Sequence, residues 1–320
     1  MARRTLSLVI LGLAIFGPTT AEAQPPVAPP PIQLYHQHLT AARVNPLGLI
    51  HTSFLTARFR LFESASPVAI NNFVGAGLTG AISPAWGRIG PRIEVQPLSV
   101  LSLFAQYEVM GTFSTFNLMA SFPTANADYS DDAIEARGDD PATEGYSTSG
   151  TVLTIGALAQ IKVGPIAARN NTRFIRQDFD LRDGDRVFYD QLFDNLMSDE
   201  GWFVQNDLDV LYVTDFGLAA GLRWSYGHVF YQDDDFLPTE DPNAEPDNDF
   251  HRLGLLAAYN FEPNGRGVIT QPTILLICQW HLEHRWRTGG CDQCVSTGVP
   301  YFALAFQFRG DLLYQEPPAE

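Results

Sequence analysis

Hydrophobic and polar residues alternate along most of this chain with a period of two. From Arg88 to Pro97 most odd-numbered positions are apolar, and most even-numbered positions are polar or charged. After a turn near Leu98 the alternation resumes from Ser102 to Val109. Successive side chains of a β-strand point to opposite faces, so this period predicts strands. Two strands joined by so short a turn predict an antiparallel hairpin.

The same pattern recurs in segments spread from His51 to Arg309, and the connections between them are of two kinds. Tight turns lie near Leu98, Gly164, Asp215 and Asn264. Long polar loops follow the segments that end near Gly111, Phe179, Tyr231 and Arg287. Short periplasmic turns combined with long outer loops are typical of bacterial outer-membrane barrels.

We therefore predict an all-β fold, an antiparallel transmembrane β-barrel of about 12 strands. The weaker segment Leu34–Arg43 is taken as the twelfth strand because such barrels have even strand numbers, although ten or fourteen remain open. No stretch is long and apolar enough for a membrane-spanning helix, and a closed barrel is the other structure that satisfies its backbone in lipid. A secreted soluble β-sandwich or lectin-like binding module is the alternative, because it also has one wet face.

The N-terminus has the features of a secretory signal peptide. Arg3 and Arg4 precede the short apolar run Leu6–Phe16, and Ala-Glu-Ala23 provides a cleavage site. The apolar run is shorter than the roughly 20 residues that a membrane-spanning helix needs. We expect residues 1–23 to be removed, residues 24–32 to form a proline-rich periplasmic spacer, residues 33–314 to form the barrel, and residues 315–320 to be a short polar tail.

The charge of the chain is strongly acidic, with a formal net charge of −16. This value argues against nucleic acid as a partner. The carboxylates are concentrated in Asp128–Glu144 and Asp233–Asp249, which lie between predicted strands. We expect solvated acidic outer loops there, with divalent cations as possible partners at the carboxylates. No cofactor and no dedicated metal site are expected.

The polar faces of the predicted strands carry long charged side chains of both signs. Confined opposite charges stabilise one another by pairing, and an unpaired charge in a dry lumen is costly. We therefore predict a charge network in a narrow or plugged lumen. Its predicted members are Arg58, Arg60, Arg88, Arg92, Glu94, Glu108, Lys162, Arg223, Arg252, Glu283 and Arg285.

A group of histidines and cysteines near the C-terminus has zinc-like spacing, with His281 and His284 preceding Cys291 and Cys294. On a strand, however, side chains three positions apart point to opposite faces, so the two histidines cannot share a metal unless the strand breaks. A disulfide between Cys291 and Cys294 is the simpler expectation for a secreted protein. Cys278 shares the apolar face of its strand and is expected to contact lipid.

No established catalytic motif occurs in the chain. Four histidines lie near strand ends that face long loops: His228, His251, His281 and His284. An outer-membrane hydrolase that acts on lipid or peptide at the outer rim is therefore the alternative to a non-enzymatic barrel.

Several short segments resemble a family of Gram-negative outer-membrane β-barrel proteins of uncharacterised function. The resembling segments are Arg43–Leu49 (RVNPLGL), Val95–Leu98 (VQPL), Gly184–Asp194 with Gly201-Trp202, and Pro300–Leu313 (PYFALAFQFRGDLL). The resemblance implies a fold and a location in the bacterial outer membrane, and no chemistry. Many such barrels end on an aromatic residue, whereas Tyr314 is followed here by QEPPAE, so we expect an internal or atypical assembly signal.

The expected function is that of an integral outer-membrane barrel with a structural, surface or small-solute pore role. The expected partners are outer-membrane lipid, lipopolysaccharide and the barrel-assembly machinery.

Overall fold

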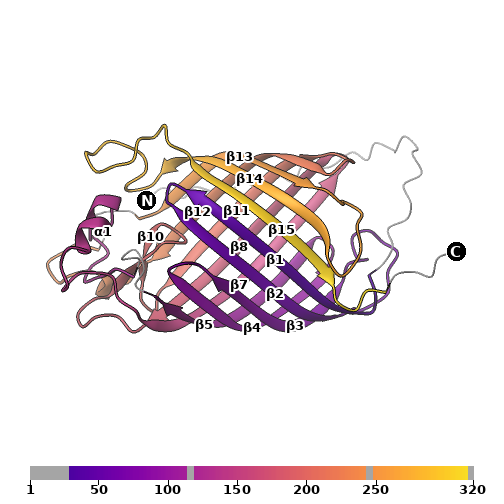
Figure 1. Cartoon of the computed structure of the whole chain (residues 1–320), viewed down its shortest axis with the longest axis horizontal. Helices are drawn as coiled ribbons and strands as arrows, with labels where there is room; N and C mark the ends of the chain where they lie inside the picture. Colours follow the sequence, from indigo (N-terminus) through magenta and orange to yellow (C-terminus); the bar gives the residue numbers. More distant parts are fainter. Residues whose placement is uncertain (1–28, 114–118, 243–247, 316–320) are drawn as a thin grey trace, which may run out of the picture.

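The computed structural model describes residues 29–113, 119–242 and 248–315. Twelve antiparallel strands form a closed barrel in which each strand pairs with its neighbours along the chain, and β1 pairs with β15 to close it (Figure 1). The barrel strands are β1 (Ile32–Val44), β2 (Gly48–Phe59), β3 (Phe73–Ile82), β4 (Trp86–Leu98), β5 (Leu101–Thr112), β7 (Ser149–Val163), β8 (Ile166–Phe179), β11 (Trp202–Val213), β12 (Leu218–Phe230), β13 (Phe250–Asn260), β14 (Thr270–Glu283) and β15 (Tyr301–Asp311).

The predicted fold class and the preferred count of twelve strands are confirmed, and the β-sandwich alternative is wrong. The weak segment Leu34–Arg43 forms β1, which begins at Ile32, inside the predicted spacer. The predicted signal peptide, most of the predicted spacer and residues 316–320 of the predicted tail lie outside the described residues. Within the described ranges, no helix has the length and apolarity required to cross a membrane.

The two ends of the barrel differ, as the alternation of turns and loops predicts. Tight turns join β4 to β5 and β7 to β8 at one end, where Gly164 adopts a positive φ of 58° that glycine accepts without strain. The long connections lie at the opposite end, together with α1 (Asp131–Arg137) and a small sheet (Figure 1). We call these the turn end and the loop end.

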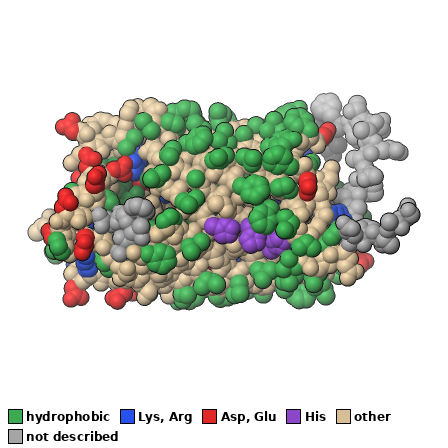
Figure 2. All heavy atoms as spheres, in the orientation of Figure 1, with side chains coloured by type: hydrophobic (Ala, Val, Ile, Leu, Met, Phe, Trp, Pro, Cys, Tyr) green, Lys and Arg blue, Asp and Glu red, His purple; other side chains and the backbone are tan. Residues whose placement is uncertain are grey.

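The outward face of the barrel is a broad apolar surface (Figure 2). Ile155, Leu222 and Phe306, which the alternation assigns to this face, are 47%, 54% and 46% exposed. Apolar side chains in water cost free energy in proportion to their area, whereas contact with lipid removes that cost. The inward face carries the polar side chains, so the alternation has the sense expected of a membrane barrel rather than of a soluble core.

A second, smaller sheet is built entirely from the long connections at the loop end. It contains β6 (Ser121–Phe122), β9 (Val187–Asp190) and β10 (Asn195–Ser198), in the order β10-β9-β6. Every residue of these strands is buried. Phe188 and Met197 pack with Phe203 and Phe250 of the barrel strands. This sheet therefore packs against barrel strands at the loop end, and we call it the plug.

The acidic connections are less solvated than the sequence suggests. The short helix η2 (Asp233–Asp235) packs against the plug, and Asp235 and Phe236 are only 4% and 8% exposed. Ser198 donates a hydrogen bond to Asp235 at 2.9 Å. The prediction that Asp233–Asp249 is wholly a solvated loop is wrong, because Phe236 has an apolar cluster to join and Asp235 has a hydroxyl partner.

Candidate functional site

The lumen holds ion pairs within and between strands. Arg58 Nε of β2 lies 2.7 Å from Glu94 Oε1 of β4, and Arg92 lies 3.5 Å from the other oxygen of Glu94. Arg92 also donates to Gln106 of β5 at 2.8 Å, and Gln106 donates to Glu108 at 2.8 Å. These side chains, from the three strands β2, β4 and β5, thus form one connected chain of ion pairs and hydrogen bonds.

Aromatic rings complete the surroundings of these cations. The Arg58 guanidinium lies 3.5 Å from the centroid of the Tyr35 ring, and the Arg92 guanidinium lies 4.0 Å from that of Phe104. A cation above an aromatic face is stabilised by the ring quadrupole, particularly where water is excluded. Arg88 joins the same network through Glu108 at 3.5 Å.

A second network occupies the opposite wall of the lumen. Asp209 of β11 accepts hydrogen bonds from Arg169 of β8 and Arg223 of β12, at 2.7 Å and 2.6 Å for the shortest contacts. Asp207 pairs with Arg173 at 3.3 Å. Asp209 is 1% exposed, so a buried carboxylate is held between two cations from the flanking strands.

Sequence reasoning missed Arg169, Arg173, Asp207 and Asp209 as members of this network. The signal was present, because Asp207 and Asp209 stand two apart on one face of their strand. On the paired strand β8, Arg169 and Arg173 stand four apart and so also share one face. The rule that selected Arg223 would also have selected them.

Several predicted network members lie elsewhere. Arg60 follows the end of β2 and contacts Glu63 at 3.4 Å at the turn end, and Lys162 lies exposed near the end of β7. Arg252 faces the lumen but packs on rings, with its guanidinium 4.4 Å from the Tyr301 centroid and 4.7 Å from that of Phe250.

Glu283 and Arg285 are not in the lumen, and the prediction is wrong for both. The β13–β14 pairing shifts register between His251 and Arg252, and such a bulge changes which face the following side chains occupy. Glu283 is therefore exposed and lies 3.4 Å from His251, whose ring contacts Tyr226 of the outward face. Arg285 lies beyond the end of β14 and donates to the carbonyl of Ala127 at 3.0 Å.

The plug is tied to the rim by a buried ion cluster. Arg287 donates to Asp194 at 2.7 Å and to Asp131 of α1 at 2.7 Å, and His284 Nε2 lies 2.8 Å from the Asp194 carbonyl oxygen. Tyr189 donates to Asp194 at 2.7 Å. Burial alone would raise the pKa of Asp194, but His284 and Arg287 hold that pKa well below its ordinary value.

A further contact joins the plug directly to the barrel wall. Arg43 of β1 donates to the carbonyl oxygens of Leu192 and Gln191, the former at 2.7 Å. The Gln191 side chain in turn donates to the carbonyl of Leu47 at 2.9 Å. We call this reciprocal contact of Arg43 and Gln191 the latch.

Next to the latch the lumen contains a small cavity with a mixed polar and apolar lining. Its volume is about 210 Å³, and its lining includes Arg173, Asp207, Arg223 and Arg252 of the wall and Leu192 of the plug. The cavity has room for a few water molecules, since one water occupies about 30 Å³ of liquid.

Comparison with known proteins finds only distant structural likeness. No protein-family model matches the chain, and no curated protein matches it. Among solved structures, the chain is similar to the translocator domain of the autotransporter NalP from Neisseria meningitidis, with 12% identity, 87% of this chain and 86% of that chain covered, and a TM-score of 0.35. It is also similar to an outer membrane channel from Pseudomonas putida F1, with 11% identity, 92% and 100% covered, and a TM-score of 0.36.

A third similar structure is OccAB1 from Acinetobacter baumannii, with 11% identity, 83% and 68% covered, and a TM-score of 0.36. At these identities the likeness concerns the fold alone. The assignment of a barrel therefore rests on the closed twelve-stranded sheet of this chain itself.

The rim histidines do not form one site. His228 Nδ1 lies 2.6 Å from Asp249, and His251 contacts Glu283 on the outward face. His281 and His284 do not point to opposite faces, because β14 ends at Glu283; their ring centroids lie 5.2 Å apart. In the described part of the chain, no group of three or more candidate ligands could hold a metal ion.

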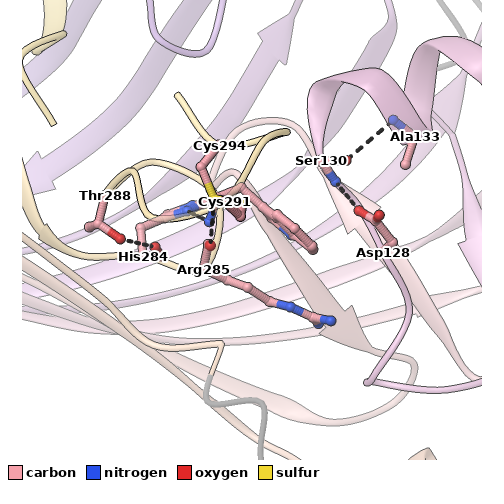
Figure 3. Close-up of a disulfide and its surroundings, with 9 residues drawn as sticks. Asp128, Ser130, Ala133, His284, Arg285, Thr288, Cys291 and Cys294 are labelled. Atoms are coloured by element: carbon pink, nitrogen blue, oxygen red, sulfur yellow. Dashed lines mark hydrogen bonds between the residues drawn. A yellow bond between two sulfur atoms is a disulfide. The ribbon is translucent and has the colours of Figure 1, made fainter. Parts of the chain in front are cut away.

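The cysteines near the C-terminus are joined as a disulfide. Cys291 and Cys294 close a short loop between β14 and β15, and Cys294 Sγ lies 3.7 Å from the Arg285 carbonyl (Figure 3). Figure 3 also shows Ser130 at the start of α1, where its side chain accepts from Ala133. The disulfide therefore constrains the loop that carries Arg285 and Arg287 toward the plug. Cys278 is free.

A polar seam interrupts the outward apolar surface on β1 and β2. Ser53 Oγ lies 3.0 Å from His51 Nε2 and 3.0 Å from His38 Nδ1, and Thr40 Oγ1 lies 2.9 Å from His51 Nδ1. Figure 2 shows histidine side chains near the middle of this face. Sequence reasoning missed this seam, although His51 and Ser53 break the apolar alternation that Ala57 continues.

Proposed function

We propose that the protein is an integral outer-membrane β-barrel that acts as a narrow small-solute pore held closed by its plug and by its lumen charges. The apolar outward face supports the membrane location. The single observation that carries the closed state is the latch, because Arg43 of the wall binds the two plug carbonyls directly above the lumen cavity. The plug thereby covers the route along the barrel axis.

The partners follow from the location. The apolar band contacts outer-membrane lipid, and the loop end faces lipopolysaccharide, where divalent cations bridge acidic loops to lipid phosphates. The barrel-assembly machinery inserts the chain after export. These partners belong to the proposal and are tested with it, by fractionation of outer and inner membranes.

Conductance in a planar bilayer tests the closed pore. The purified wild type should give no large, stable single-channel steps, and heat-modifiable migration on a gel should show that the same preparation is folded. Large, steady conductance from folded protein would overturn the closed state and indicate an open porin. No detectable association with the outer membrane would overturn the location.

A second candidate function, acyl-ester hydrolysis, is favoured by the polar seam rather than by the rim. Ser53 is a hydroxyl nucleophile within hydrogen-bond distance of His51, and Thr40 orients the far nitrogen of that ring. This is the arrangement of a nucleophile, a base and an orienting group. Ser53 would attack the ester carbon while His51 takes its proton and returns it to the leaving alcohol, and water would then release the acyl group.

The location of Ser53 restricts the substrate of this second function. Ser53 lies near the middle of β2, within the apolar band, so the ester must be a neutral lipid that dissolves in the bilayer interior. Labelling by a lipophilic fluorophosphonate and hydrolysis of a neutral fluorogenic ester should both vanish in Ser53→Ala. They should persist in Ser225→Ala, which removes a lumen hydroxyl. Equal activity in both variants would exclude this function.

A further inference from the structure

A large pocket lies at the loop end, between the barrel rim and the plug. Its volume is about 1060 Å³, several times that of the lumen cavity. One side is formed by the β1–β2 hairpin and β15, and the other side by α1 and the plug residues Tyr189 and Gln191. It is a second cavity, separate from the one in the lumen.

The outer walls of this rim pocket continue the lipid-facing surface. Leu47, Leu49, Phe302 and Leu304 all line it, and they are 76%, 51%, 37% and 49% exposed. These are outward-facing side chains of the hairpin and of β15. A molecule dissolved in the membrane can therefore reach the pocket sideways, without leaving an apolar environment.

The charged groups at the inner end of the pocket are already bound within the chain. Arg287 is held by Asp194 and Asp131, and Arg43 is held by the plug carbonyls. Glu135 of α1 adds a carboxylate to the lining. The described lining thus has apolar walls, paired cations and extra acid, which disfavours an anionic ligand and suits a neutral one.

We propose that the rim pocket binds an uncharged, apolar small molecule that enters from the outer leaflet. The volume matches that of binding sites for drug-sized ligands, which fall between about 300 and 1,000 Å³. Binding here does not require that the lumen conduct, so it stands apart from the proposed pore function.

The pocket also adjoins the lumen cavity. Arg43, Gly48, Leu49 and Gln191 line both spaces, so the latch residues form the partition between them. A ligand in the rim pocket lies against the side chains that hold the plug closed. Occupancy should therefore protect these residues from chemical and proteolytic attack.

Photolabelling in lipid nanodiscs tests this proposal. The probe is a neutral hydrocarbon carrying a diazirine, and the labelled residues are mapped by peptide mass spectrometry. Labelling within residues 44–49 and 302–304 should saturate and be competed by the unlabelled hydrocarbon. Labelling at the general lipid-facing positions Ile155 and Leu222 should rise linearly with probe concentration. Linear, uncompeted labelling at both places in the wild type would overturn the proposal without any variant.

A matched pair of variants places the ligand. Leu304→Trp fills the pocket and should abolish the saturable labelling, whereas Leu222→Trp makes the same change on the far lipid-facing strand β12 and should leave it intact. Heat-modifiable migration checks that each variant is folded. Saturable labelling that survives in folded Leu304→Trp would overturn the site.

A second arm identifies the source of the hydrocarbon. The same diazirine is placed in the acyl chain of a phosphatidylcholine. The free hydrocarbon should compete with this lipid for the pocket and displace its label. A pocket labelled only by the phospholipid, and unaffected by free hydrocarbon, would show a lipid-filled crevice and overturn the small-molecule proposal.

Discussion

Arg287 Nε lies 2.7 Å from Asp194 Oδ2, and both side chains are 3% exposed. Asp194 stands between two plug strands, whereas Arg287 belongs to the connection between β14 and β15. The pair therefore fixes the plug to a separate loop across a dry interface. Removing one partner of such a pair is expensive, because the other charge stays buried.

We expect Asp194→Asn to loosen the plug by about 3 kcal/mol, the lower end of the range for a broken buried pair, because Arg287 keeps Asp131. Asparagine tolerates the positive φ of 58° at this position, so the loss of stability in this variant does not come from backbone strain. Hydrogen exchange in β9 and β10 should accelerate while the barrel strands stay protected. Asp183→Asn, an exposed aspartate of the same connection, is the control and should change nothing.

The latch predicts a gain of conductance. Arg43→Ala removes the cation that binds the Leu192 carbonyl and should raise single-channel conductance in planar bilayers above that of the wild type. Arg309→Ala removes an arginine at the turn end that contacts Gln271 and should leave conductance unchanged. If both variants conduct alike, the latch does not close the pore.

The plug should lose stability as pH rises from about 4 to about 6. Burial raises the pKa of Asp199 to about 6, above its ordinary value, so the folded plug binds this proton more tightly than the unfolded chain. The stabilisation that protonated Asp199 contributes is fully present below the ordinary pKa of aspartate. It is lost as the pH rises through the pKa of Asp199 in the folded protein. Asp199→Asn should flatten this dependence in hydrogen exchange corrected for intrinsic rates, and Asp183→Asn should retain it.

Neutralising a buried carboxylate of the lumen network should lower the free energy of unfolding strongly, whereas neutralising an exposed carboxylate outside it should lower it little. Glu94→Gln leaves Arg58 without its closest carboxylate and should cost about 3–5 kcal/mol in the free energy of unfolding. Glu63→Gln breaks the exposed contact with Arg60 and should cost about 0–1 kcal/mol. Urea unfolding in vesicles measures both values, and equal small costs would indicate a water-filled lumen.

If the apolar outward face contacts lipid, the destabilisation caused by an arginine there should depend on its depth in the bilayer. Ile155→Arg places a charge near the middle of β7 and should destabilise the inserted barrel by about 2–4 kcal/mol. Val163→Arg makes the same kind of change at the end of that strand, where the cost should fall to about 0–1 kcal/mol. A neutral result for Ile155→Arg would contradict contact with lipid there.

The alternation of side chains predicted the barrel strands, and the alternation of short turns with long loops favoured a membrane barrel over a sandwich. The period of two also selected Arg58, Glu94 and Arg223, which form ion pairs in the structure. The period of two failed for Glu283, because the β-bulge before it exchanges the inward and outward positions along the strand. A single sequence gives no clear signal of such a bulge.

The plug could not be predicted from local pattern. Its strands have four residues or fewer, too short for a period of two to be recognised. Its key contact joins Asp194 to Arg287, which are 93 positions apart, and neither residue stands in a regular element. Likewise, the polar seam required knowing that β1 and β2 pair so that Thr40 lies opposite His51.

The pairing of β1 with β15 has a consequence for the order of folding. The Leu34 amide donates a hydrogen bond to the Asp311 carboxylate, which lies 277 positions later in the chain. The first and last strands must therefore meet before the barrel is closed. This closure carries a high entropic cost. The latch needs Arg43 from the first strand, and the ion cluster needs Arg287 from beside the last. We expect the plug to assemble only after the cylinder closes, as a separate late step with its own rate.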